Sequence, residues 1–499
     1  MTLHKISTKE RFDVCVIGAG PSGYAAAMRA VDYGKKVLLI EKDKLGGAGI
    51  HQGALWSKTW WELSREAFFI RQHGRSFGID HPDFSYDKVS GEVAKAVENR
   101  QEMLTHHMNN INVSLGDFFQ FLHGTARILD NHRVEVVNND TIHEVEADHI
   151  ILATGSRPRK LPHIPIDEKY IFTSDGLGNL KDFPKSMVIL GAGVIGCEFA
   201  TIFSNFGHTR VHLIDKGDRI LPFEDADVVG IVEQNLEAKD VLIHRNSRLV
   251  EMKVEMGEVV YTLAYDDGSK EVFKVEKALV SVGRVPNYDD LFSDHLSIDI
   301  DKRGIIDKDT QTSIDNIYAV GDITADISLV NVGELEGRHA IEKIYGNPEP
   351  LIYENISTIM FLAPEIAGVG MNEVQAQQKE LDYKVVSLDY STISRAVAMR
   401  NVQGFIKILV TNDEEMKILG MRVIGEHASS AIQAAALLIS MGKGIKVLAE
   451  LIHPHPSIIE GIQECCRMLQ GKSMFKPSVL RKAMNYKVYE NGAYTDVVG

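Results

Sequence analysis

The stretch "DVCVIGAGPSGYAAAMRAVDYGKKVLLIEK", residues 13–42, decides the fold class of this chain. Residues 14–17 are apolar and suit a strand that is buried on both faces of a sheet. Residues 24–31 are rich in helix formers, and residues 37–40 are apolar again. The stretch therefore predicts a strand, a glycine-rich turn, a helix and a second strand that ends in an acid.

The glycines of this turn have the spacing of a dinucleotide-binding fingerprint. Gly18, Gly20 and Gly23 stand between the first strand and the helix, and Glu41 closes the second strand. Such glycines permit a tight turn, let the backbone approach a pyrophosphate and let the helix pack on the sheet. The helix N-terminus attracts the phosphates, and the acid accepts hydrogen bonds from a ribose. The combination disfavours the alternative of a glycine turn in an ordinary α/β core.

A second stretch, "MVILGAGVIGCEFATIFSNFGHTRVHLIDK" at residues 187–216, repeats this design. The glycines and the acid of the second unit are Gly191, Gly193, Gly196 and Asp215. An aspartate at this place favours the free 2′-hydroxyl of NAD and repels the 2′-phosphate of NADP. Lys216 and Arg219 follow closely, and we interpret them as solvated residues of a surface loop. Two such units predict two nucleotide sites.

Length and composition limit the possible classes of protein. A chain of 499 residues is longer than the length at which a single hydrophobic core stops growing, so more than one domain is expected. Its 41 glycines suit many tight turns. A net charge of −15 argues against nucleic acid as a partner. The polar start and the lack of an apolar run near the roughly 18 residues of a membrane span predict a cytoplasmic protein without a transmembrane segment. With four cysteines, a disulfide framework is not expected.

Further motifs occur along the chain in a recognisable order. They are "ATGSRPR" at 153–159, "SVGRVPN" at 281–287, "IYAVGDIT" at 317–324, "PEIAGVG" at 364–370 and "HPHPSIIE" at 453–460. Together with the two glycine units, they make the chain, to about Leu469, resemble the FAD-dependent pyridine nucleotide–disulfide oxidoreductases. The resemblance is closest to dihydrolipoamide dehydrogenases and soluble pyridine nucleotide transhydrogenases.

The resemblance implies an α/β protein with two Rossmann-like dinucleotide-binding domains plus a C-terminal α+β dimerisation domain, which would form a homodimer. The predicted domains are an FAD-binding domain at 1–155 and 285–350, an NAD-binding domain at 156–284, a dimerisation domain at 351–473 and a C-terminal tail at 474–499.

The resemblance also implies the cofactors FAD and NAD and the residues that bind them. The residues expected at FAD are Gly18, Gly20, Gly23, Glu41, Gly47, Lys58, Thr154, Gly155, Gly321 and Asp322. Those expected at NAD are Gly191, Gly193, Gly196, Glu198, Asp215 and Gly283. Asp322 would hydrogen-bond the ribityl chain of FAD, and no metal is predicted.

By the same resemblance, Lys58 and Glu198 would form an ion pair beside the flavin N5, where hydride arrives. Such a pair is physically useful because Lys58 can favour the anionic reduced flavin while Glu198 keeps the lysine in place.

The chain departs from the family at residues 46–58, where the family motif is G-G-T-C-x-N-x-G-C-x-P-S-K. Gly49 and Ala54 occupy the positions of the two cysteines that relay electrons to a disulfide or dithiol, and Trp56 replaces the proline. Soluble transhydrogenases also lack a complete pair and have a histidine where His51 stands. Neither glycine nor alanine can carry a thiolate, so we predict that this stretch contains no thiol relay.

His455 and Glu460 match the His-Glu dyad that the family contributes across the dimer interface as proton donor and acceptor. A carboxylate that orients an imidazole and raises its basicity suits acid–base chemistry. A dyad kept only for packing is the alternative once the thiols are absent, and transhydrogenases usually lack this histidine.

The remaining cysteines and the tryptophans have two interpretations each. Cys465 and Cys466 are either an exchangeable thiol pair or buried helix cysteines, and we favour burial because neighbouring side chains on a helix diverge by about 100°. Cys15 and Cys197 are expected to be core thiols. The tryptophans either form a wall for a flat acceptor ring or pack a helix against its own domain, and we favour packing; they are Trp56, Trp60 and Trp61.

The predicted function is transfer of hydride from NADH to FAD and of electrons onward to a small-molecule, nonthiol acceptor. That acceptor is a quinone, another nicotinamide nucleotide or an unidentified molecule. The alternatives are a dihydrolipoamide dehydrogenase-type dithiol oxidoreductase and a catalytically silent flavoprotein sensor or assembly subunit.

Overall fold

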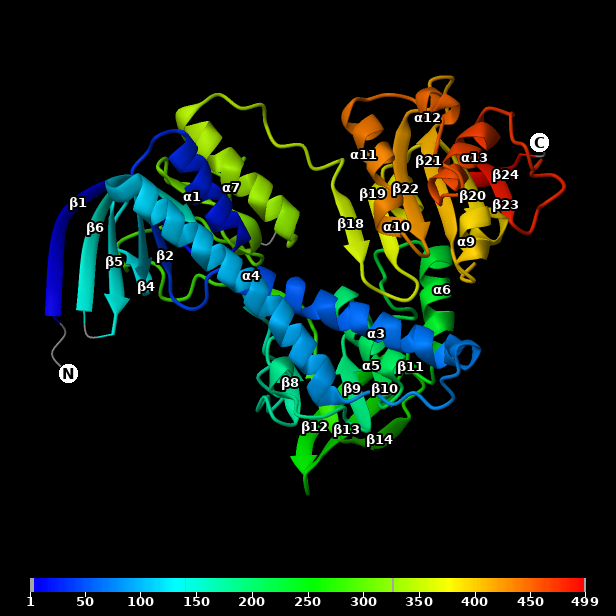
Figure 1. The fold of residues 1–499 in the computed structure, drawn as a ribbon, viewed down its shortest axis with the longest axis horizontal. Coiled ribbons are helices and arrows are strands. Elements are labelled where there is room, and N and C mark those ends of the chain that lie inside the picture. Colours follow the sequence, from blue (N-terminus) through cyan, green and yellow to red (C-terminus); the bar gives the residue numbers. More distant parts are fainter. Residues whose placement is uncertain (1–3, 140, 325–326, 498–499) are drawn as a thin grey trace. The chain divides into compact units, whose positions relative to one another are not determined.

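The computed structural model describes residues 4–139, 141–324 and 327–497. The chain divides into two compact units, which are described separately (Figure 1). The first contains Met1–Leu63, His81–Asp182 and Leu279–Leu351, and the second contains Ser64–Asp80, Phe183–Ala278 and Ile352–Gly499.

The first unit is built on a seven-stranded sheet in which β3, β2, β1, β6 and β17 run parallel, while β5 and β4 continue the other side of β6 in antiparallel pairing. The strands are β1 (His4–Ile17), β2 (Val37–Glu41), β3 (Phe119–His123), β4 (Thr125–Ile128), β5 (Arg133–Asn138), β6 (Thr141–Leu152) and β17 (Ile317–Ala319). A two-stranded ribbon joins β7 (Ser156–Pro158) to β16 (Arg284–Pro286). Short strand β8 (Ile171–Thr173) also belongs to this unit.

Helices cover this sheet, and α1 and α7 lie side by side in Figure 1. The helices are α1 (Pro21–Asp32), α2 (Gly47–His51), α4 (Tyr86–Leu115) and α7 (Val330–Tyr345); α3 (Leu55–His73) begins here and ends in the second unit. The strand, turn, helix and strand predicted from residues 13–42 are β1, α1 and β2.

The second unit contains the predicted second glycine unit as β9 (Ser186–Leu190), α5 (Val194–Phe206) and β10 (Arg210–Ile214). β10 pairs in parallel with β9 and with β11 (Leu242–His244). An antiparallel sheet follows, formed by β12 (Ser247–Glu255), β13 (Glu258–Tyr265) and β14 (Lys270–Val275). Helix α6 is Ala226–Glu237, and β15 (Lys277–Val280) crosses the boundary between the units.

The last part of the second unit is an antiparallel sheet in the order β18-β19-β22-β21-β20-β23-β24. Its strands are β18 (Ser357–Met360), β19 (Ile366–Gly370), β20 (Tyr383–Asp389), β21 (Phe405–Thr411), β22 (Ile418–Ile424), β23 (Met484–Glu490) and β24 (Ala493–Asp496). Its helices are α8 (Glu373–Gln378), α9 (Ser394–Ala398), α10 (Ala428–Ala431), α11 (Gln433–Ser440), α12 (Lys446–Glu450) and α13 (Ile459–Leu469). The α/β class with a mixed last domain is confirmed.

The segment predicted as a C-terminal tail, 474–499, contains two strands. β23 pairs with β20 over Leu388↔Met484 to Tyr383↔Tyr489, and β24 pairs with β23, so Met484–Glu490 and Ala493–Asp496 extend the last sheet. The segment is polar and short, and its strand conformation comes from pairing with an edge that only the folded chain provides.

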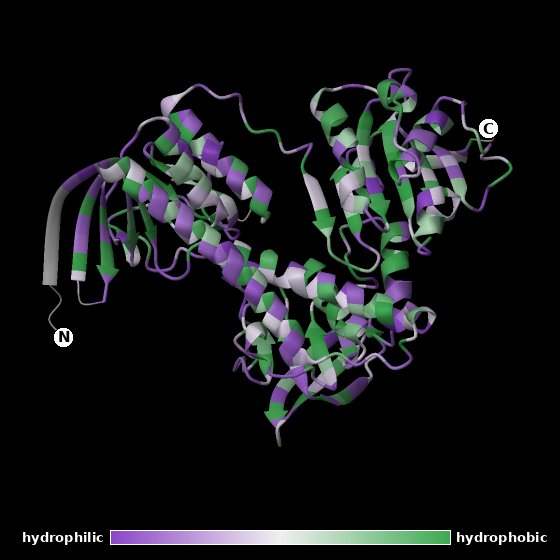
Figure 2. Ribbon diagram, viewed as in Figure 1, coloured by the Kyte–Doolittle hydropathy of each residue, from purple (hydrophilic) through white to green (hydrophobic). Residues whose placement is uncertain are grey.

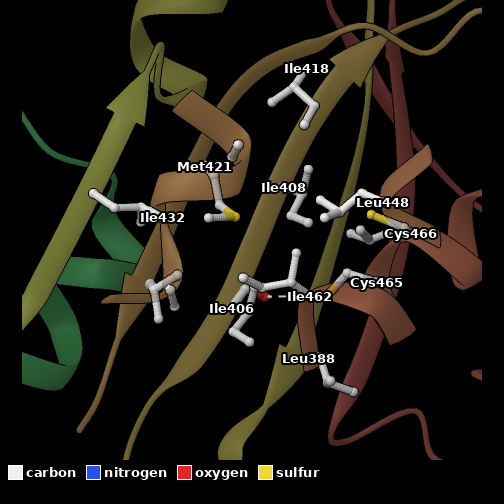
Figure 3. Close-up of a cluster of buried hydrophobic side chains, with 14 of the residues drawn as sticks. Leu388, Ile406, Ile408, Ile418, Met421, Ile432, Leu448, Ile462, Cys465 and Cys466 are labelled. Carbon is white, nitrogen blue, oxygen red and sulfur yellow. Dashed lines mark hydrogen bonds between the residues drawn. The ribbon is translucent and has the colours of Figure 1, made fainter. Parts of the chain in front are cut away.

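The apolar core of the last sheet contains the two adjacent cysteines of α13. Figure 3 shows Cys465 and Cys466 among side chains such as Ile406, Ile462 and Leu448. Strand β21 is mostly hydrophobic in Figure 2 and nearly all buried, and α13 packs against it and against β20. Burial raises the pKa of the Cys466 thiol to about 12 and raises that of Cys465 well above its ordinary value. The expectation of buried helix cysteines is confirmed.

A buried lysine joins the last sheet to α6 within the second unit. Lys407 of β21 is 1% exposed, and its Nζ lies 2.7 Å from a carboxylate oxygen of Asp225, 2.7 Å from Asp227 and 2.9 Å from Glu373. Burial opposes the charge on Lys407, but the three carboxylates hold its pKa above the ordinary range. The three acids are close enough to hold a metal ion, yet a lysine cation already lies among them.

We expect Lys407→Met to lower the free energy of unfolding by about 3–5 kcal/mol, because it leaves the buried carboxylate of Asp225 without its cation. The matched control is Lys417→Met, which removes an exposed pair with Glu415 at 3.2 Å and should cost less than about 1 kcal/mol. Urea unfolding of the FAD-loaded proteins compares the two. Equal costs would show that the buried cluster adds no special stability.

Two buried histidines lie on neighbouring strands, His212 on β10 and His244 on β11. The Nδ1 of His212 is 2.6 Å from the hydroxyl of Tyr261, and the ring of His212 lies 5.6 Å from that of His244. Burial, with smaller contributions from His244 and Arg210, lowers the pKa of His212 to about 4. Burial also lowers the pKa of His244. Both rings are therefore neutral in the folded protein at neutral pH.

The free energy of unfolding should consequently fall as the pH drops from about 6.5 towards 4, because only the unfolded chain binds protons at these histidines in that window. His212 alone should contribute about 3 kcal/mol to this loss. His212→Gln should lower stability at pH 7.5 but flatten the pH dependence, as measured by urea unfolding at several pH values. The exposed His295→Gln is the control; an unchanged slope in His212→Gln would refute the assignment.

Candidate functional site

The first glycine turn forces its backbone very close to the end of β6. Gly18 has φ +105°, and a Cβ there would lie 2.3 Å from the carbonyl oxygen of Ala153. A Cβ on Gly23 would lie 1.9 Å from the carbonyl oxygen of Gly18. Around Gly20, the N-cap of α1, a Cβ would meet nothing within 4 Å. Two glycines therefore serve packing, while the third leaves space at the helix N-terminus for a ligand.

The acid at the end of β2 is fixed by backbone groups. One carboxylate oxygen of Glu41 accepts the N–H of Ala19 at 2.7 Å, and the other accepts the N–H of Asp43 at 2.8 Å. Carboxylate oxygens keep further acceptor capacity for a ribose hydroxyl. Gly47 lies beside the first glycine turn, because a Cβ on it would be 3.2 Å from the Cα of Gly20. Ribose binding by Glu41 stays a prediction.

Asp215 repeats the arrangement of Glu41 in the second unit. Its carboxylate accepts the N–H of Ala192 at 3.1 Å and the N–H of Gly217 at 2.8 Å. Gly191 has φ +103°, and Gly193 is the N-cap of α5, which begins at Val194 and buries Gly196. In both glycine turns, backbone N–H groups thus donate to the carboxylate of an acid in the same way.

The motif at 153–159 meets the motif at 281–287 through Asn287. Thr154 Oγ1 donates to the carbonyl oxygen of Asn287 at 2.5 Å, and the N–H of Asn287 donates to the carbonyl oxygen of Gly155 at 2.9 Å. A Cβ on Gly155 or Gly283 would meet nothing within 4 Å, and both residues have positive φ. These predicted residues line open space, and their contacts with cofactors stay predictions.

Gly321 and Asp322 follow β17 and lie next to α1 and α7. The N–H of Gly321 donates to the buried carboxylate of Glu336 at 2.7 Å, and Gly337 approaches the carbonyl oxygen of Ser22 so closely that a Cβ would be 2.1 Å away. Asp322 Oδ2 accepts a hydrogen bond from Ser156 Oγ at 2.6 Å. The structure therefore brings Asp322 together with the ribbon β7–β16.

Lys58 and Glu198 lie on different helices in different units. Lys58 is on the first turn of α3, in the first unit. Glu198 is buried on α5, and its Oε1 accepts the N–H of Phe361 at 3.1 Å in the second unit. Their predicted ion pair at the flavin stays a prediction.

The His-Glu dyad is formed within the chain. His455 Nδ1 lies 2.9 Å from Glu460 Oε1, while the N–H of Ser457 donates to Glu460 Oε2 at 2.8 Å. Burial opposes ionisation of Glu460, but the hydrogen bonds from Ser457 and His455 hold its pKa below the ordinary range. The His455 side chain is 70% exposed. With Nδ1–H bonded to the carboxylate, Nε2 is the ring atom left for a reacting group.

The tryptophans lie on α3, in its part within the first unit. Trp60 and Trp61 are 5% and 3% exposed, and the Trp60 ring packs 5.4 Å from the ring of Tyr86. Trp56 is half-buried and meets Trp60 edge-on at 6.1 Å. Packing is therefore confirmed for Trp60 and Trp61, whereas Trp56 keeps an exposed part.

Comparison with known proteins agrees with this geometry. The family model described as pyridine nucleotide-disulphide oxidoreductase matches residues 12–337, and the model of its dimerisation domain matches residues 356–466. The chain belongs to the pyridine nucleotide-disulphide oxidoreductase family. This oxidoreductase is accordingly an enzyme that uses FAD and NAD(H).

Individual relatives of this oxidoreductase cover nearly the whole chain. A dihydrolipoyl dehydrogenase of Geobacillus stearothermophilus is 32% identical over 463 residues, which are 92% of this chain and 96% of that protein. One of Chlamydia pneumoniae is 33% identical over 458 residues, 90% of this chain and 95% of that protein. Crystalline LpdA from Mycobacterium tuberculosis has a TM-score of 0.83 at 25% identity, covering 92% of this chain and 99% of LpdA. Among the described residues, we find no helix with both the length and the apolar character of a bilayer span.

The position of the first family cysteine is closed to a side chain in this oxidoreductase. A Cβ on Gly49 would lie 2.6 Å from Cγ of Pro21, so the glycine lets α2 approach α1. The four cysteines of the sequence are all buried and free. Cys15 and Cys197, as expected, are core thiols, and burial raises the pKa of both.

Sequence reasoning missed several residues that hold the predicted ones in place. They are Ser156, Asp175, Arg284, Asn287 and Glu336. Ser156, Arg284 and Asn287 lie inside the motifs at 153–159 and 281–287, each close to a glycine that was predicted to bind a cofactor. Their polar side chains beside those glycines were the available signal. Asp175 and Glu336 had no local signal.

We expect this oxidoreductase to prefer NADH to NADPH, because Asp215 directly follows β10 beside the second glycine turn and would repel a 2′-phosphate. Stopped-flow flavin reduction at limiting concentrations of each nucleotide measures the preference. Asp215→Asn should reduce the preference about tenfold by removing the charge while keeping the acceptor oxygen. Equal or better use of NADPH by the unmodified protein would show that Lys216 or Arg219 neutralises the acid.

Proposed function

We propose that this oxidoreductase takes hydride from NADH and passes electrons directly to a small-molecule acceptor that is not a disulfide or dithiol. The observation that carries the proposal is the closed position at Gly49, with Ala54 at the second family cysteine. A disulfide relay needs two thiols near each other at the flavin. Cys465 and Cys466 support no such relay, because both thiols lie in the core of the last sheet.

The residues of the first unit fit FAD. The open space at Gly20 and Gly155 and the N-terminus of α1 suit a pyrophosphate, and Glu41 has acceptor oxygens for a ribose. We propose that 1–155 and 285–350 hold FAD and that 156–284 holds NAD. When bound, FAD accepts a hydride and returns its electrons to a second substrate.

The proposed roles of the chain's residues follow from their charges. Lys58 would supply positive charge where negative charge collects after hydride arrives, and Glu198 would keep Lys58 oriented. Glu198 is suited to this role because the N–H of Phe361 fixes its carboxylate on the rigid helix α5. The exposed part of Trp56 offers an aromatic surface to a flat acceptor such as a quinone or a nicotinamide.

An anaerobic titration with NADH tests the proposal. Two electrons per FAD should bleach the flavin in one phase, without the long-wavelength band that a thiolate donates to oxidised flavin. Cys465→Ser and Cys466→Ser should take up the same two electrons. Uptake of four electrons, a thiolate-type band lost in either variant, or reduction of NAD by dihydrolipoamide would favour a dithiol oxidoreductase; failure of NADH to reduce FAD would favour a silent sensor.

We also propose a homodimer in which His455 acts in the partner's site, supported by the dimerisation-domain match and by the exposure of His455. Sedimentation should give about twice the chain mass of 55.5 kDa. His455→Ala should slow reoxidation of the flavin by an acceptor that takes a proton, by roughly 10²-fold or more, with unchanged reduction by NADH. A stable active monomer would contradict the dimer, and unchanged reoxidation would leave the dyad a packing role.

A further inference from the structure

A chain of hydrogen bonds ends on the carboxylate of Asp322. Ser156 Oγ donates to Asp322 Oδ2 at 2.6 Å, and Arg284 Nε donates to Ser156 Oγ at 2.8 Å. Arg284 Nη1 reaches Asp175 Oδ1 at 2.9 Å, and Arg284 Nη2 donates to the carbonyl oxygen of Ser156 at 2.8 Å. All four residues belong to the first unit.

The chemistry of the guanidinium, hydroxyl and carboxylate groups decides which of them donates each hydrogen bond. A guanidinium only donates, so Ser156 Oγ must accept from Arg284, and its single proton is left for Asp322. Hydrogen bonds to ionised groups are shorter and stronger than neutral ones. The hydrogen bond from Ser156 therefore holds Asp322 Oδ2, and because it restrains rotation of the carboxylate it also fixes the direction of Oδ1.

The position of this series of hydrogen bonds in the fold gives it a role beyond local packing. Ser156 begins β7 and Arg284 begins β16, so both lie on the two-stranded ribbon of the first unit. Arg284 is 18% and Asp175 21% exposed, so solvent screens their pair only partly. Asp175 fixes the guanidinium, which fixes the hydroxyl, which fixes Asp322.

We propose that Ser156, oriented by Arg284 and Asp175, is a positioning residue that aims the Asp322 carboxylate at the ribityl chain of FAD. The inference rests on the proposed role of Asp322 at FAD. The ligand chemistry is that of a polyol, whose hydroxyls donate to a fixed carboxylate.

The test measures the affinity of the apoprotein for FAD by quenching of flavin fluorescence. Ser156→Ala should weaken FAD binding about tenfold, the effect of losing one hydrogen bond to a charged group. Ser156→Thr keeps the hydroxyl and should restore most of the affinity. Ser293→Ala is the matched control, because Ser293 Oγ donates to the carbonyl oxygen of Leu129 at 2.7 Å in the same unit, away from Asp322. It should leave FAD affinity unchanged.

A double-mutant cycle separates positioning from general stability. Asp322→Ala should weaken FAD binding, and Ser156→Ala should add almost nothing to Asp322→Ala if the serine acts only through that carboxylate. Additive losses would overturn the proposal and assign Ser156 a structural role. If Asp322→Ala weakens binding but Ser156→Ala does not, the positioning role fails alone. Unchanged binding in Asp322→Ala would overturn the assignment of Asp322 to FAD, and the proposal with it.

Should Ser156→Ala fail to fold, Arg284→Lys provides the second variant. Lysine keeps the charge but cannot make the Nε and Nη bonds together, so FAD affinity should again fall about tenfold. Wild-type affinity in a folded Arg284→Lys protein would also overturn the proposal.

Discussion

The backbone contact between the first glycine turn and the end of β6 is the constraint on which the first unit depends. Gly18 approaches Ala153 more closely than any side chain would allow, and Gly23 approaches Gly18 in the same way. The N–H of Ala153 donates to the carbonyl oxygen of Ile17 at 2.9 Å, which fixes β1 beside β6 at this point. Because α1 begins directly above this contact, its N-terminus is aimed at the open space around Gly20.

In both units an acid binds the glycine turn through backbone N–H groups. Glu41 and Asp215 each bind the N–H of the residue after the first glycine and the N–H two residues beyond the acid. The acid thus ties the end of one strand to the turn after the neighbouring strand, so its position is already fixed without a nucleotide. Pre-organised acceptors of this kind lower the entropy cost of binding.

Local patterns in the sequence predicted the elements that are built locally, while tertiary contacts decided the rest. Strand, turn, helix and acid lie within about 30 consecutive residues, so spacing alone identified Gly18 and Asp215. In the sequence, Lys407 is one lysine in an apolar strand, and its three carboxylates come from the N-cap of α6, from α6 itself and from α8. The relay from Asp175 to Asp322 joins residues over 100 positions apart. Strand β23 likewise needs the edge of β20.

The glycine at position 49 matters for packing as well as for the family motif. In place of a cysteine, Gly49 lets α2 close onto Pro21 at the start of α1, the helix whose first turn the glycine fingerprint has already fixed. A cysteine introduced at Gly49 would have to displace Pro21, and Pro21 cannot move freely because it begins α1 beside Gly20. Position 49 therefore lacks both a cysteine side chain and the space to hold one. Under the proposed function, an acceptor would reach the flavin directly, and the shape and polarity of the surface around Trp56 would select it.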